Sequence, residues 1–158
     1  MYSESFKIFV NGALDNYFVG TGNPNSCVLL IGKESAIGTN DNIGQKWYSK
    51  NARDWKEHID KNTCECLNYF VDENHPLRKN WGKNTWSKYQ LLSNYIWNKQ
   101  PEKYWVDFLQ TMFTTEINDS PAKTTFTANK SGLNERKFLF KNSAFINEFS
   151  VIVLACSN

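Results

Sequence analysis

An apolar run from Cys27 to Ile31, followed at once by Gly-Lys-Glu, constrains the fold of this chain more than any other feature. The run is rich in branched side chains and has no polar alternation, which is typical of a strand buried on both faces of a parallel sheet. A turn cluster at 22–25 precedes it. Charged residues directly after such a strand lie at its carboxyl end, where open α/β sheets bind ligands. The sequence therefore predicts a functional site around Glu34.

The size and charge of the chain limit the class of protein. It has 158 residues, a formal net charge of +2 and four cysteines. This length suits one domain with its own core, and we expect a single domain over residues 1–158. The charge alone does not require a polyanionic partner. The sequence shows no secretory segment and no apolar run near the length of a membrane span, and the cysteines form no disulfide framework. We therefore expect a cytoplasmic protein without a membrane partner.

Predicted strands alternate with predicted helices along the chain. Apolar patterns predict strands at 27–31, 111–117 and 151–156. They predict helices at 5–17, 51–60, 84–98 and 134–149, and a further helix that begins at Pro101. Polar stretches predict loops at 35–50, 61–84 and 122–132. Residues expected to face the core include Phe6, Phe9, Trp55, Trp86, Tyr89, Ile96, Trp105, Phe138, Ile146 and Phe149. Two of the cysteines fall in strands expected to be buried. Strands joined by helices imply parallel crossovers and a layered α/β domain.

The Gly32-Lys33 pair does not form a phosphate-binding loop. Such a loop requires Ser or Thr directly after the lysine, and an earlier glycine separated from the Gly-Lys pair by four residues. Here Glu34 follows the lysine, and strand residues precede the glycine. We therefore exclude nucleotide hydrolysis of the phosphate-loop type.

Four other residues have the chemistry of metal ligands but not the spacing. They are His58, Cys64, Cys66 and His75. A C-x-C pair needs a second close pair to complete a tetrahedral zinc site, and the sequence offers none. We predict no metal site and no cofactor.

Two carboxylates, Glu34 and Glu116, lie at or near the carboxyl ends of predicted strands. If these strands are neighbours, both side chains point into one crevice, where a carboxylate acts as a general base or orients a water. It could also accept a hydrogen bond from the amino group of a nucleobase. The alternative is that each glutamate pairs with a nearby lysine or caps a helix. The stretch WGKNTWSKY (81–89) could stack on bases and contact phosphates, but the same pattern suits an amphipathic helix with its Trp inward.

The stretch GTGNPNSCVLLIGKESA resembles the start of the uracil-DNA glycosylase superfamily, whose GxGNPxAxVLLIGEAPG-like motif holds the catalytic water and the base. FTTEINDSPAKT (113–124) is similar to the second strand and following loop of that family, and VIVLAC is similar to its third strand. The resemblance implies a three-layer α/β/α sandwich with a short central parallel sheet, in the strand order second, first, third. It implies that Glu34 is the catalytic residue and that the substrate contacts come from Gly32, Lys33, Ser35, Ala36, Glu116 and Asn118.

The chain departs from the family pattern at several positions. Ser35 stands where the family has Pro, and Glu116 stands where it has the Asn that reads uracil. A carboxylate cannot donate a hydrogen bond to a uracil carbonyl, so Glu116 suggests a base with an exocyclic amino group. The fourth strand and the catalytic His motif of the family follow its third strand, where this chain ends. We therefore expect a truncated or shortened relative, whose third strand is an exposed edge open to self-association.

The resemblance implies a DNA glycosylase-type hydrolase. In its complete form it would bind a flipped nucleobase in DNA and hydrolyse the N-glycosidic bond; without the His segment we expect little or no activity. The alternative is a non-catalytic nucleic-acid-binding or protein-interaction module that kept the fold. A small-molecule or nucleotide hydrolase is a third class, which rests only on the two carboxylates.

Overall fold

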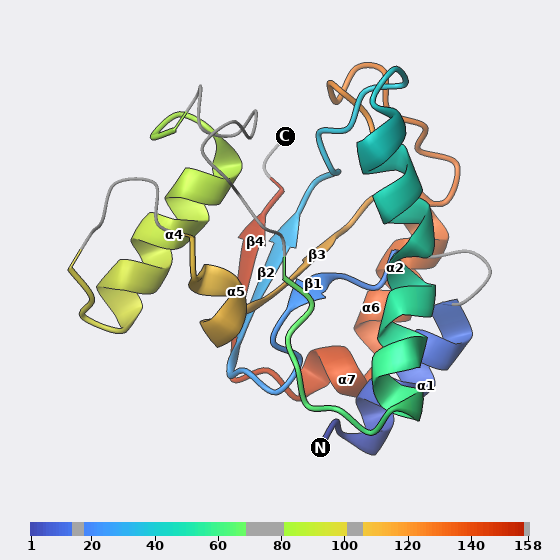
Figure 1. Ribbon diagram of the computed structural model, residues 1–158. Coiled ribbons are helices and arrows are strands. Elements are labelled where there is room, and N and C mark those ends of the chain that lie inside the picture. The colour runs from blue at the N-terminus through green and yellow to red at the C-terminus, as the bar shows by residue number, and fades with distance from the viewer. Residues whose placement is uncertain (14–17, 69–80, 101–105, 157–158) are drawn as a thin grey trace.

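The computed structural model describes residues 1–13, 18–68, 81–100 and 106–156 and shows a mixed α/β protein (Figure 1). Its strands are β1 (Thr21–Gly22), β2 (Val28–Gly32), β3 (Phe113–Glu116) and β4 (Val151–Ala155). Its helices are α1 (Glu4–Ala13), α2 (Asn42–Asp60), α4 (Thr85–Ile96), α5 (Phe108–Thr111), α6 (Leu133–Asn142) and α7 (Ala144–Asn147). Within the described ranges, no helix is long and apolar enough to cross a membrane.

The strands form one sheet in the order β1-β3-β2-β4. β2 pairs in parallel with both neighbours, so that Leu30 lies opposite Thr114 on one side and Val153 on the other. The three predicted strands and their order are therefore confirmed. β1 was not predicted and pairs antiparallel with β3, which makes the sheet mixed rather than wholly parallel. Two residues are too few to leave a periodic pattern in the sequence.

Helices cover both faces of the sheet and bury β2 completely, as its apolar run predicts. On one face, Leu29 and Ile31 pack with apolar residues of α1, α2, α6 and α7. On the other face, Val28 and Leu30 pack with residues of α4 and α5. Figure 1 shows these two groups of helices on opposite sides of the strands. Large aromatic side chains fill the first cluster, where the rings of Phe6 and Trp55 lie edge to face with centroids 5.0 Å apart.

β4 is apolar like β2, but its side chains are largely exposed, so the prediction that this strand is buried is wrong. Val151 is 47% exposed, Ile152 41% and Leu154 68%. The reason is position, because β4 lies at the end of the sheet and β2 lies inside it. The two cysteines expected in buried strands are affected as well: Cys27 is exposed, and Cys156 is only partly buried.

The long helix α2 begins within a segment that we expected to be a loop. Its first residue is Asn42, inside the predicted loop 35–50, and the Oδ1 of Asp41 caps it by accepting the N–H of Gly44 at 2.8 Å. The predicted helix 51–60 is its second half, with Trp55 fully buried. Gly44 and the polar residues around it hid the first turns of α2 from the sequence pattern.

The predicted helix 134–149 is divided at Ser143 into α6 and α7. The Oγ of Ser143 accepts the N–H of Ile146 at 3.3 Å and caps α7. The division changes which residues face the core: Ile146 and Phe149 are buried as predicted, but Phe138 is 71% exposed. A continuous helix would have placed all three on one side.

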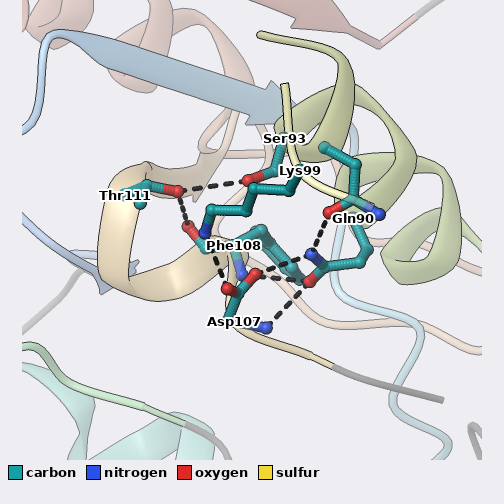
Figure 2. Close-up of polar contacts among 7 residues, drawn as sticks. Gln90, Ser93, Lys99, Asp107, Phe108 and Thr111 are labelled. Carbon is teal, nitrogen blue, oxygen red and sulfur yellow. Dashed lines mark hydrogen bonds and ion pairs between the residues drawn. The ribbon is translucent and has the colours of Figure 1, made fainter. Parts of the chain in front are cut away.

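A polar network joins α4 to α5 where we expected an apolar stripe (Figure 2). The Oε1 of Gln90 accepts the backbone N–H groups of Asp107 and Phe108 at 2.8 and 3.0 Å, and its Nε2 donates to Asp107 at 2.7 Å. Lys99 forms an ion pair with Asp107 at 2.6 Å. Tyr89 is buried as predicted, whereas Ile96 is exposed. The predicted helix start at Pro101 and the inward Trp105 lie outside the described residues.

Candidate functional site at the carboxyl edge of the sheet

The carboxyl ends of β2, β3 and β4 meet at one edge of the sheet. Gly32, the last residue of β2, lies opposite Glu116 of β3 and Ala155 of β4. Hydrogen bonds continue past the strands, because the N–H of Asn118 donates to the carbonyl oxygen of Lys33 at 2.9 Å. The segments after β2 and β3 are therefore held side by side, as the sequence predicts for its candidate site.

A small pocket with a cavity volume of about 260 Å³ opens at this edge. Its lining residues are Lys33, Glu34, Ile117, Asn118, Lys130, Leu133, Lys137 and Cys156. Three lysines against one glutamate give it a positive charge. Of the expected site residues, the structure brings Lys33, Glu34 and Asn118 together in the lining, while Gly32, Ser35, Ala36 and Glu116 do not line it.

Glu34 lies directly after β2, and a residue from a distant loop holds its carboxylate. The hydroxyl of Thr125 donates a hydrogen bond to Oε1 of Glu34 at 2.5 Å. Thr125 belongs to the segment 122–132, which was predicted as a polar loop, and nothing in its sequence indicated this contact. Glu34 is therefore oriented at the pocket wall, where a carboxylate can accept a proton from a bound water.

Asn118 lines the pocket and carries a buried hydrogen-bond donor. Its side chain is 98% buried, since only 2% of the residue is exposed. Its Oδ1 accepts the N–H of Ser120 at 3.3 Å, but its Nδ2 has no hydrogen-bond partner among the described residues. A buried amide donor without a partner is costly, so a ligand acceptor at this wall would gain a hydrogen bond that the protein lacks.

Glu116 lies behind Gly32 rather than in the pocket. A Cβ atom at position 32 would come within 2.1 Å of Oε2 of Glu116, so the glycine is needed for this close approach. That oxygen is buried and, within the described part of the chain, has no hydrogen-bond partner. Burial, and next the charge of Glu34, raise the pKa of Glu116 to about 8, although Arg136 and a hydrogen bond from Ser35 act to lower it. Glu116 is thus mainly protonated at neutral pH.

Arg136 of α6 fixes the end of β3, and sequence reasoning missed it. The side chain is fully buried. Its Nε donates to the carbonyl oxygen of Glu116 at 3.2 Å, and its Nη2 donates to Oγ1 of Thr115 at 3.1 Å and to the carbonyl oxygen of Phe18. The guanidinium also lies 4.6 Å from the ring centre of Phe140. One arginine in an amphipathic helix gives no sequence signal for such a role.

The structure favours the packing interpretation of the other candidate stretches. Trp86, in the aromatic stretch 81–89, packs edge to face on Phe108 with centroids 5.3 Å apart. Among the described residues, no group of three or more His, Cys, Asp or Glu side chains could hold a metal ion. His75, the fourth residue of the zinc alternative, lies outside the described residues.

No protein-family model, no curated protein and no solved structure matches this chain. The fold and the site define a mixed α/β protein with a basic pocket at the carboxyl edge of its parallel strands. The resemblance to the uracil-DNA glycosylase superfamily stays a prediction.

Proposed function

We propose that this protein is a divergent uracil-DNA glycosylase-like protein that binds one nucleotide unit of DNA in the pocket at the carboxyl edge of the sheet. In its complete form it would hydrolyse the N-glycosidic bond of a flipped base. The observation that carries the proposal is the shared lining of this pocket by Glu34, Asn118 and three lysines.

The chemistry of the pocket suits the parts of a nucleotide. Lys33, Lys130 and Lys137 supply the positive charge that phosphate groups require. The Nδ2 group of Asn118 can donate to a carbonyl oxygen on the edge of a base. Pockets for drug-sized ligands occupy roughly 300–1,000 Å³, so the smaller volume here suits a single base with its sugar or phosphate.

Glu34 is the proposed general base, and Asn118 takes the base-reading role that the resemblance gives to Glu116. Glu34 lines the pocket and is held by Thr125, so its carboxylate can orient a water toward the bond that breaks. Asn118 lines the same pocket, whereas the Glu116 carboxylate is buried behind Gly32. Because Asn118 offers a donor, the proposal favours bases with a carbonyl group at the recognised edge.

Binding to labelled single-stranded oligonucleotides tests the proposal first. We expect anisotropy to show binding that weakens with salt. The double variant Lys130→Ala/Lys137→Ala should reduce the slope of the logarithm of the binding constant against the logarithm of the salt concentration by about 1–2. Each lysine that contacts a phosphate contributes close to 1 to this slope. Lys141→Ala is the matched control, since Lys141 lies on the same helix as Lys137 but is exposed outside the pocket. No binding at low salt would overturn the proposal.

Base release separates the hydrolase from a non-catalytic module. If the protein is a hydrolase, chromatography detects free base from an oligonucleotide that contains uracil, and Glu34→Gln abolishes release while binding is kept. Glu57→Gln, an exposed position on α2, is the control and should retain release.

A non-catalytic nucleic-acid-binding or protein-interaction module is the second candidate. One observation favours it: among the described residues, the pocket lining has one carboxylate, that of Glu34, and no histidine. Salt-dependent binding without release of any base would support this module and refute the hydrolase.

A further inference from the structure

Among the residues that the structure describes, the outer edge of β4 is open. β4 is the last strand of the sheet, and within the described ranges no strand pairs with its outer side (Figure 1). Its exposed side chains, Val151, Ile152 and Leu154, lie on both faces of the strand, because successive residues point to opposite faces. An edge strand that is apolar on both faces is a template for pairing with another strand.

The backbone geometry shows which groups of β4 are available for pairing. The N–H of Val151 donates to the carbonyl oxygen of Cys27 at 3.0 Å, so the backbone groups of Val151 point toward β2. Backbone direction alternates along a strand, so those of Val153 and Ala155 point the same way. The N–H and C=O groups of Ile152 and Leu154 therefore point outward from the sheet.

The segment that contains β4 lacks two of the usual guards against association, charged side chains and proline. Residues 149–158 include no charged side chain and no proline. Val153 packs on the hydrophobic cluster beneath α4 and α5. Trp86 and Leu92 of α4, and Trp97 directly after it, also pack on this cluster and are only partly buried.

We propose that β4 pairs antiparallel with β4 of a second copy of this chain, about a two-fold axis at Val153. In this register Ile152 of each copy lies opposite Leu154 of the other and exchanges both backbone hydrogen bonds with it. Val153 faces Val153 of the second copy as the central pair without hydrogen bonds. The two sheets then become one continuous sheet, in a closed dimer with an isologous interface.

A second copy fits this edge because the strand is complementary to itself. Ile152 and Leu154, whose backbone groups point outward, lie on either side of Val153 in the strand. A two-fold axis at Val153 therefore places Ile152 of each copy opposite Leu154 of the other copy. Every cross-strand pair is apolar: Val151 with Ala155, Ile152 with Leu154, and Val153 with itself. No like charges meet, because none are present on the strand.

Cysteine cross-linking in the full chain tests both the dimer and its register. The four native cysteines are replaced by Ser, and Val153→Cys is introduced in this background. We expect a dimer in sedimentation equilibrium and a disulfide-linked dimer after mild oxidation, because the two Val153 positions face each other directly. The matched control is Val151→Cys on the same face of the strand. The two copies of position 151 would be about 14 Å apart along the strands, too far for a disulfide.

A charged variant supplies a second test. Ile152→Lys places a lysine opposite Leu154 and should convert the dimer to a monomer with an unchanged far-ultraviolet circular dichroism spectrum. A monomeric parent protein at high micromolar concentration would overturn the proposal. So would cross-linking at position 151 but not 153, or a dimer that persists in Ile152→Lys. A monomer with exchange-protected amides at Ile152 and Leu154 would show that another segment of the chain covers the edge, and would overturn it too.

Discussion

Replacing Glu116 with Gln should make the folded protein more stable at neutral and alkaline pH. The carboxylate is buried against Gly32, and its Oε2 has no hydrogen-bond partner in the described part of the chain. Burial, and next the negative charge of Glu34, hold its pKa at about 8, above the ordinary 4.5. Arg136 and Ser35 oppose this shift without cancelling it. Glutamine keeps the shape of the side chain and removes its ionisation.

The sign and size of the effect follow from linkage. Below pH about 4.5 the carboxyl is protonated in both states and Glu116 adds no pH dependence. As the pH rises toward about 8, the unfolded state loses this proton while the folded state keeps it, so the free energy of unfolding falls. The fall is about 1.4 kcal/mol per pH unit and totals about 5 kcal/mol over the interval, after which it levels off. Glutamine does not ionise. We therefore expect Glu116→Gln to lack roughly half to all of this pH-dependent fall in the free energy of unfolding.

Urea denaturation followed by tryptophan fluorescence, from pH 5 to pH 9, measures the effect. The difference in free energy of unfolding between Glu116→Gln and the parent should grow with pH up to about 8 and then become constant. The matched control, Glu57→Gln on the exposed side of α2, should follow the parent at every pH. A constant difference between Glu116→Gln and the parent across this range would refute the reasoning.

Two further predictions concern the supports of the site. Arg136→Met should cost about 3–5 kcal/mol of unfolding free energy, because it removes a buried cation and leaves its buried acceptors unpaired. The control Arg53→Met, at an exposed position of α2, should cost less than about 1 kcal/mol in the same urea denaturation assay. Equal losses in the two variants would contradict the role of Arg136. Gly20→Ala should lower the melting temperature strongly, since Gly20 has a φ of 139° and a Cβ there would lie 2.4 Å from the carbonyl oxygen of Thr114. In Gly12→Ala the new methyl group meets nothing within 4 Å, so that variant should melt at or above the parent temperature; similar melting of the two variants would contradict the prediction.

The three main strands could be predicted because their signals are local, whereas their order was expected only from the resemblance to a known family. The run Cys27–Ile31 has the composition of a buried parallel strand, and the structure places β2 inside the sheet. Since parallel strands end at one edge, the sequence also placed Glu34 correctly after β2, at that edge.

Other features depend on contacts that no local pattern records. Thr125 reaches Glu34 from a loop about ninety positions away, and Arg136 reaches Glu116 from a helix across the sheet. Gln90 is a polar residue inside a helix, and only the position of Asp107 shows why it is buried. Each of these side chains acts through a partner that folding brings near, so its sequence context resembles that of an ordinary surface residue.

The sequence by itself determined the α/β class, the central strand and the end of that strand beside which the candidate pocket lies, because hydrophobic periodicity and turn residues act over a few positions. Only the tertiary structure decided that Asn118 lines the pocket while Glu116 lies buried behind Gly32. It also decided that the side chains of β4, as apolar as those of β2, are largely exposed. The physical reason is that burial and pKa depend on what surrounds a side chain in space, and neighbours in space come from segments far apart in the sequence.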